Sequence, residues 1–401
     1  MTHRNLNYYL CTLLLFFATI AEAQYEDNKS IPFLSFRADL GQIIQTNDFL
    51  KGDNLHSTPM TEYYAYMLEV GLQSRGSKEW QQLYDFPSYG VGVYTATLDN
   101  RAEIGRPWSL FGFYRGTFFR SADFRHTFRY NIELGLATNW HCYDEQTNPK
   151  NITIGSPVTA HLGLGLDYSY ALTSNAQIGL GAGFTHFSNG AVRKPNKGLN
   201  LMSVGARLTY LLNPESYPTK NILPKKKDNE IDFTFGMGVK RYECDTTLHP
   251  ELTSEFKLGS RYMVSTLQVV YLHQYCHKGK YGLGVSVTYD EWLGSDTRTV
   301  GDDVEVILGP TRKRFNFGLV ASHEFCIANL SIPTQLGVYL YQPKGISQQK
   351  KKLFQRMGVK YSFNCGLQAG VNIYAHQLSK ADFIEWNLGY RLRISRKNAK
   401  S

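Results

Sequence analysis

The stretch "HLGLGLDYSYAL", residues 161–172, alternates residue by residue between two kinds of side chain. One set reads Leu162, Leu164, Leu166, Tyr168 and Tyr170, and the other reads His161, Gly163, Gly165, Asp167 and Ser169. Residues two apart share one face of a β-strand, so the stretch has one apolar face and one small or polar face. A strand of this kind is typical of the wall of a transmembrane β-barrel.

The same alternation recurs along nearly the whole chain. Before the midpoint it covers 33–45, 62–73, 88–99, 108–120, 126–141, 175–188 and 199–212, and after it 231–242, 260–275, 280–292, 313–327, 329–342, 355–363, 366–376 and 381–394. The total is about 16 strands, an even number, as antiparallel bacterial barrels require when both ends of the chain lie on the periplasmic side.

The connections between these segments alternate in length. Tight ones ("TSNA", "HKGK", "AN" and "NC") are followed in the later strands by long ones, at 243–259, 293–312 and 343–354. Short periplasmic turns and long outer loops produce this pattern in outer-membrane barrels. The connection 74–87 does not fit it.

Composition agrees with a barrel in a membrane. Aromatic residues make up 14% of the chain, and 35 glycines accompany them. After the first residues, no long apolar segment follows that could span a membrane as a helix. A large soluble β-sandwich protein is the alternative. The net charge of +9 suits acidic partners such as phosphorylated lipid headgroups, and nothing in the chain resembles a nucleic-acid-binding module.

Five divisions of the chain are expected. The first 23 residues read as a secretory signal, with Arg4, an apolar stretch and small residues around a cleavage site; an N-terminal anchor helix is the alternative. The predicted divisions are 1–23 (signal peptide), 24–212 (first barrel half), 213–230 (a Pro- and Lys-rich periplasmic linker), 231–394 (second half) and 395–401 (tail).

The two halves look like a faint duplication. "IGLGAGFTHFSNG…LNLMSVGARLTYL" parallels "LQAGVNIYAHQLSKADFIEWNLGYRLRI". Alternation alone fits one barrel of about 16 strands or two of about eight. We expect one barrel, because barrels fused in tandem are rare, with two eight-stranded repeats as the alternative. Inward glycines such as Gly282 and Gly284 would suit the narrow barrels.

The cysteines indicate neither a metal site nor a redox site. Those after the signal are Cys142, Cys244, Cys276, Cys326 and Cys365. They are scattered, odd in number and free of metal-ligand spacing, so we expect at most one or two disulfides. No cofactor is expected.

The stretch "GFTHFSNGAVRKPNKGLNLMS", residues 183–203, places polar residues on an apolar wall. His186 and Ser188 continue the lipid-facing row of Phe184. If Phe184 pairs with Met202 on the returning strand, His186 lies directly opposite Asn200. Polar groups facing hydrocarbon are costly, so either the strand has already left the membrane here or these residues carry a function.

The run H-x-S-N, followed by a Lys/Pro/Asn/Gly loop and an alternating strand, resembles the lipid A 3-O-deacylase (PagL) family of outer-membrane barrels. The resemblance is specific over 184–210, where His186, Ser188, Asn189, Pro195, Asn196 and Gly198 fall at the family's spacing.

That resemblance implies a serine esterase that removes an ester-linked acyl chain from lipid A in the outer leaflet, without a metal or an organic cofactor. Ser188 would be the nucleophile and His186 its general base, and Asn196 with backbone N–H groups near Asn189 and Gly190 would form the oxyanion hole. The family's acidic residue falls at position 200, where this chain has Asn200. An amide orients the imidazole but does not neutralise its charge.

The basic residues of the loop have an expected role too. Arg193, Lys194 and Lys197 would pair with lipid A phosphates, or they form an ordinary solvated loop. The corresponding His376 of the second half is predicted to point into the lumen, with Leu378 where a nucleophile would stand.

A non-catalytic barrel in the outer membrane of a Gram-negative bacterium is the rival interpretation. It could be a porin, an uptake channel or a relative that has lost the chemistry. The sequence leaves open the acyl position cleaved, the chain-length preference and the oligomeric state.

Overall fold

The computed structural model describes residues 30–190, 192–214, 228–241, 261–300, 303–343, 352–376 and 380–394. The predicted signal peptide and tail, and residues 215–227 of the predicted linker, lie outside these residues. The described chain is almost entirely antiparallel β-structure, and none of its helices has the length and apolar character needed to cross a bilayer.

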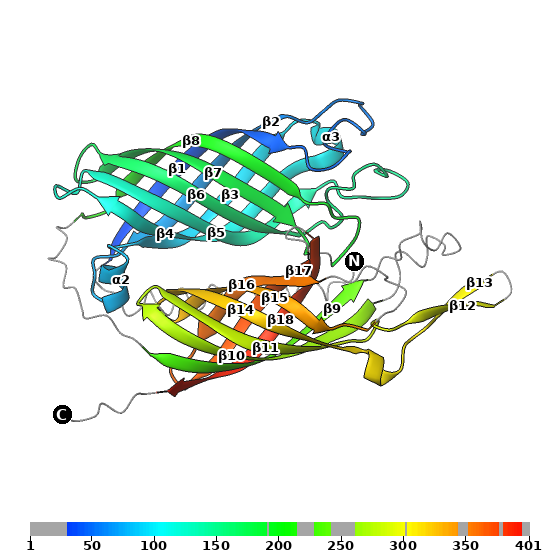
Figure 1. The fold of residues 1–401 in the computed structure, drawn as a ribbon. Coiled ribbons are helices and arrows are strands. Elements are labelled where there is room, and N and C mark those ends of the chain that lie inside the picture. Colours follow the sequence, from blue (N-terminus) through cyan, green and yellow to red (C-terminus); the bar gives the residue numbers. More distant parts are fainter. Residues whose placement is uncertain are drawn as a thin grey trace, which may run out of the picture. The chain divides into compact units, whose positions relative to one another are not determined.

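The first eight strands form one closed barrel (Figure 1). They are β1 (Ile31–Ile44), β2 (Glu62–Gln73), β3 (Ser88–Leu98), β4 (Gly105–Arg120), β5 (His126–Trp140), β6 (Thr159–Ala171), β7 (Ala176–Ser188) and β8 (Leu199–Leu211). The barrel closes because β8 pairs back onto β1, from Phe33 opposite Leu211 to Ile44 opposite Asn200.

A second closed barrel follows in the chain. Its strands are β9 (Asn229–Arg241), β10 (Arg261–Cys276), β11 (Gly279–Asp290), β14 (Phe315–Ile327), β15 (Leu330–Tyr341), β16 (Leu353–Ser362), β17 (Leu367–His376) and β18 (Lys380–Ile394). It closes between β18 and β9. The connection from β11 to β14, predicted as a loop, contains a hairpin of β12 (Asp296–Val300) and β13 (Asp303–Ile307) and a short helix, η1 (Thr311–Lys313).

The prediction of one barrel of about 16 strands is therefore wrong, and the alternative of two eight-stranded barrels is confirmed. The physical reason lies in the inward faces. Glycines leave room for large side chains of the same lumen: a Cβ on Gly92 would lie 2.5 Å from the Phe111 ring, and one on Gly337 would lie 2.1 Å from the Phe354 ring. Eight strands enclose a space that such side chains just fill.

Ion pairs occupy much of the remaining space in both lumens. In the first barrel Glu69, which is fully buried, pairs with Arg115 and Arg207. In the second, Lys360 pairs with Asp232 at 2.6 Å and also with Glu324. Buried charges of this kind are tolerated when they are paired, so each lumen is packed with mutually paired side chains.

The connection 74–87 closes one end of the first barrel. It contains α2 (Glu79–Leu83), seen at that end in Figure 1, and buries Tyr84 and Phe86. The Gln73 side chain donates a hydrogen bond to the Phe86 carbonyl at 2.5 Å, and Arg120 donates to the Asp85 carbonyl at 3.0 Å. Because its residues pack into the end of the barrel, the connection 74–87 is longer than a tight turn. We call this end the turn end and the opposite end, where α3 (Arg101–Ile104) lies, the loop end.

Candidate active site on the wall of the first barrel

The β7–β8 hairpin has the register predicted from the sequence. Phe184 lies opposite Met202 and His186 lies opposite Asn200. The His186 and Asn200 side chains meet, with 2.7 Å between Nδ1 and Oδ1. An amide oxygen can only accept a hydrogen bond, so in this contact Nδ1 carries the proton and donates it. Nε2 is then the basic nitrogen of the ring.

The residue between His186 and Ser188 fixes the direction in which both point. Phe187 is fully buried in the lumen, with ring centroids 5.2 Å from Trp140, 5.0 Å from His161 and 5.7 Å from Tyr94. Because faces alternate along a strand, burying Phe187 places His186 and Ser188 together on the outer wall, where both are half-buried. This aromatic anchor was not identified from the sequence.

The loop 189–198 brings Asn196 back to Ser188. Asn196 Nδ2 donates to Ser188 Oγ at 3.2 Å, while Asn196 Oδ1 accepts the Asn189 N–H at 3.3 Å. A backbone N–H can only donate, so this second contact determines which way the Asn196 amide points. Its NH₂ group therefore faces Ser188.

This arrangement modifies the predicted oxyanion hole. Asn196 lies beside the serine as expected, but the Asn189 N–H is engaged by the Asn196 side chain. Gly190 follows with a φ of 61°, in the left-handed region, at the point where the chain turns out of the strand. Asn196 Nδ2 is thus the donor that the structure places next to Ser188 Oγ.

Gly198 holds the loop against the His186 ring. Its φ is 75°, and a Cβ at this position would lie 2.9 Å from His186 Cε1. Its N–H donates to the Thr153 carbonyl at 3.0 Å, and the N–H of Lys197 donates to the Ile152 carbonyl at 2.9 Å. The close approach and the left-handed backbone both require glycine here.

Loops far apart in the sequence support this segment. Thr153 Oγ1 donates to Asn47 Oδ1 at 3.1 Å, and Asn151 Nδ2 donates to the carbonyl of Glu103 at 3.1 Å. The Glu103 carboxylate in turn accepts hydrogen bonds from the N–H of Leu55 and from Asn100. We call this network at the loop end, built from 45–61, 99–104 and 141–158, the loop cap.

Glu103 is the ionisable centre of the loop cap. Burial alone would raise the pKa of its carboxyl group, but hydrogen bonds from Asn100, Leu55 and His56 outweigh burial and hold that pKa below its ordinary value. The carboxylate form is therefore the one that organises these loops.

Asn200 has a further neighbour that sequence reasoning missed. Its Nδ2 lies 3.5 Å from Thr46 Oγ1, just beyond the end of β1. A hydroxyl can both donate and accept, and so can a neutral imidazole, so neither neighbour forces one orientation on the Asn200 amide. Asn196 is fixed in orientation by its partners; Asn200 is not.

The three predicted phosphate-binding residues share the loop of Asn196. Arg193 and Lys197 are exposed, and Lys194 is half-buried. They lie between Ser188 and the return of the chain into β8, so their charge is close to the site in sequence. Their role stays a prediction.

In its described residues, the β17–β18 hairpin of the second barrel, which matches β7–β8, has no equivalent of this wall site. His376 is buried in the lumen as predicted, 3.0 Å from the Tyr339 hydroxyl and 3.6 Å from an Asp382 carboxylate oxygen. Position 378 lies outside the described residues. Within the ranges described, no cluster of His, Cys, Asp or Glu has the arrangement of a metal site, and Cys142, Cys276, Cys326 and Cys365 form no disulfide there; Cys244 lies outside these ranges.

Two family models match the chain. Residues 65–209 match the family model described as lipid A 3-O-deacylase (PagL), and residues 229–394 match the model described as acyloxyacyl hydrolase, C-terminal domain. The two matches fall within the first and the second barrel respectively. A search of curated proteins gave no match.

Solved structures give weaker likenesses. Neisserial surface protein A is 12% identical, with a TM-score of 0.30 over 45% of this chain and 96% of that one. The outer membrane enzyme PagL is 16% identical, with a TM-score of 0.29 over 43% of this chain and 97% of that one. The toluene transporter TodX of Pseudomonas putida is 10% identical, with a TM-score of 0.16 over 91% of this chain and 89% of that one.

Proposed function

Because the chain belongs to the lipid A 3-O-deacylase (PagL)-type acyloxyacyl hydrolases, we propose that its first barrel is an outer-membrane serine esterase. The substrate is an ester-linked acyl chain of lipid A, and the acyl group passes through an ester with Ser188. The observation that carries the proposal is the pair of contacts on one outer wall, between His186 and Asn200 and between Asn196 and Ser188.

In the first half of the reaction, His186 Nε2 takes the proton from Ser188 Oγ as that oxygen attacks the ester carbonyl carbon. The carbonyl oxygen becomes an oxyanion, which Asn196 Nδ2 stabilises by hydrogen bonding. The intermediate collapses by breaking the bond to the sugar oxygen. His186 returns the proton to that oxygen, and the acyl chain remains on Ser188.

In the second half, His186 removes a proton from a water molecule that attacks the acyl-enzyme. The fatty acid leaves and Ser188 regains its proton. Asn200 holds the imidazole through Nδ1 but contributes no negative charge when the ring is protonated. No metal or organic cofactor takes part in these steps.

The location suits a lipid substrate. Leu164 and Met202, next to the site on the same outer face, are 55% and 56% exposed, and they offer an apolar surface for an acyl chain. An ester near the hydrocarbon boundary meets Ser188 without leaving the membrane. Arg193, Lys194 and Lys197 would hold the phosphates of the headgroup.

The rival function, a channel, would need an open lumen. In the first barrel the ion pairs of Glu69 and the packing of Tyr84 and Phe86 fill this space. A filled lumen does not favour the passage of ions or solutes through this barrel. Measurement of ion conductance by the purified protein in planar bilayers separates the two functions, because a channel conducts and a wall esterase does not.

The test is fatty-acid release from purified lipid A by the folded protein in detergent. Ser188→Ala should abolish release while the barrel still folds, as judged by the gel mobility of the unheated protein. Ser174→Ala, at the exposed turn at the other end of β7, is the matched control and should behave like the wild type. Equal release by Ser188→Ala and the wild type would refute the assignment of the nucleophile.

A further inference from the structure

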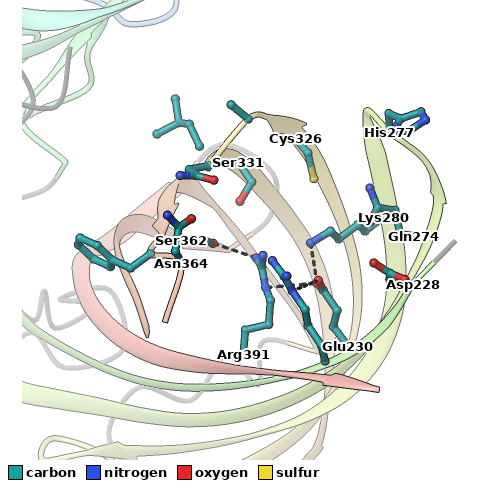
Figure 2. A pocket seen from close by; sticks show the side chains of 15 residues that line it. Asp228, Glu230, Gln274, His277, Lys280, Cys326, Ser331, Ser362, Asn364 and Arg391 are labelled. Carbon is teal, nitrogen blue, oxygen red and sulfur yellow. Dashed lines mark hydrogen bonds and ion pairs between the residues drawn. The ribbon is translucent and has the colours of Figure 1, made fainter. Parts of the chain in front are cut away.

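The second barrel contains a polar cavity of about 180 Å³ at the end where the short β10–β11, β14–β15 and β16–β17 turns lie (Figure 2). The cavity is lined by the ends of β9, β10, β11, β14, β15, β16 and β18 and by the turns after β10, β14 and β16. We call it the mouth pocket. It lies in the second barrel, and the proposed esterase chemistry does not use it.

Cationic side chains dominate the lining. Lys280, Arg391 and Arg393 outnumber the two carboxylates, Asp228 and Glu230. Lys280 Nζ lies 2.5 Å from Glu230, Arg391 Nε lies 3.2 Å from the same carboxylate, and Arg393 Nε lies 3.9 Å from it, so one acid is shared among three cations. Asp232 approaches Arg391 at 3.6 Å but is also paired with Lys360.

Lys280 and Arg391 both retain N–H donors that Glu230 does not use. A lysine has three N–H donors and an arginine has five. Lys280 gives one to Glu230, and Arg391 gives Nη2–H to Ser362 Oγ at 2.9 Å, as Figure 2 shows. The remaining donors can serve an acceptor that enters the mouth pocket.

Ser331 adds a donor with no protein partner. Its side chain lines the mouth pocket, is 3% exposed, and has no hydrogen-bond partner in the described part of the chain. A buried hydroxyl without a partner is costly, so the fold leaves an acceptor or donor to be supplied from outside. Figure 2 places Ser331 across the cavity from the pair formed by Arg391 and Glu230.

We propose that the mouth pocket binds a phosphate group, with Lys280, Arg391 and Ser331 as its donors. A water molecule takes up about 30 Å³, so the cavity has room for one phosphate oxyanion and part of its substituent. The group can belong to a phospholipid headgroup or to a free phosphate compound. Both present the same oxygens to a lysine and an arginine.

The test is isothermal titration calorimetry of the full chain in a non-ionic detergent without phosphate. Inorganic phosphate should bind with a saturable heat. Ser331→Ala should weaken binding about tenfold, which is the usual effect of losing a hydrogen bond to a charged group. Lys280→Gln should weaken it at least as much. Ser331→Ala removes no hydrogen bond to the described residues, so the barrel should fold normally.

Lys150→Gln is the matched control, since Lys150 is a half-exposed cation of the first barrel that pairs with Asp53. This variant should bind phosphate like the wild type. Glycerophosphoethanolamine, a soluble phosphodiester, distinguishes the sources: binding of the diester indicates a lipid headgroup, and binding of phosphate monoesters alone indicates a free phosphate compound. The absence of saturable heat, or heats that Ser331→Ala and Lys280→Gln leave unchanged, would show that the cavity holds water alone and would overturn the proposal.

Discussion

Replacing Asn200 with aspartate should raise the rate of deacylation. Asn200 Oδ1 lies 2.7 Å from His186 Nδ1, and aspartate has nearly the same shape, so the contact survives the change. Aspartate has two equivalent oxygens, which removes the choice of orientation that the amide has with Thr46 and His186 as its neighbours. It also adds a negative charge beside the imidazolium that forms during catalysis.

The size of the effect follows from the separation of the charges. Two unit charges about 4 Å apart near a protein surface interact with about 4 kcal/mol. Each 1.36 kcal/mol is a factor of ten in rate, so the upper limit of the gain is about a thousandfold. Both side chains are half-buried, and salt screening reduces the interaction, so we expect a gain between about tenfold and a thousandfold.

The assay is the initial rate of fatty-acid release from lipid A, compared at equal concentration of folded protein. Asn213→Asp, at the exposed turn after β8, makes the same change in charge far from the site and should leave the rate unchanged. Asn200→Glu adds the charge with one more methylene, so its gain should be smaller than that of aspartate. A rate that falls in Asn200→Asp would mean that another carboxylate already serves His186, and the reasoning from this pair would be refuted.

The remaining predictions concern the other parts of the site and the topology. Asn196→Ala should lower kcat about a hundredfold or more with little change in KM, measured with the same assay, because its NH₂ group faces Ser188. Gly198→Ala should lower activity more than it lowers the temperature of barrel unfolding, since the added Cβ would lie 2.9 Å from His186 Cε1; equal losses of both would contradict a local effect. The loop cap should loosen in acid: the pKa of Glu103 is lowered in the folded protein, so its stabilisation is complete above the unfolded value of about 4.3 and is lost as the pH falls through the folded value. Limited proteolysis at a series of pH values checks this, and Glu103→Gln should remove the dependence. An epitope in 293–312 should be labelled on intact cells and one in 213–230 should not; labelling of the second would reverse the assigned topology.

The strands and the register of the β7–β8 hairpin could be predicted because they depend on local alternation. A shift of one residue would expose the wrong face, so the apolar row from Ile178 to Phe184 excludes every pairing that differs by a single residue from the one in the structure. Barrel closure could not be predicted in this way. Each strand alternates identically whether β8 pairs with β1 or with β9, and the choice depends on how bulky side chains such as Phe111 fill the lumen.

Only the part of the site that is formed by paired residues of one hairpin could be predicted. The contact of His186 with Asn200 follows from register, whereas the orientation of Asn196 depends on how a loop without regular structure folds back. The support from Thr153 and Asn47 joins segments separated by more than a hundred residues. Such contacts produce no periodic pattern in the sequence from which they could be predicted.

The burial of Phe187 between His186 and Ser188 limits how this hairpin can change over evolutionary time. Deleting or inserting one residue in β7 before His186 would turn Phe187 to the lipid and carry both polar side chains into the aromatic lumen. Length variation in this strand is therefore restricted to even steps, which preserve the face of every residue. Homologous sequences that keep both polar residues should differ in length in the loops at either end of β7, and a change of one residue within the strand should be accompanied by a compensating bulge.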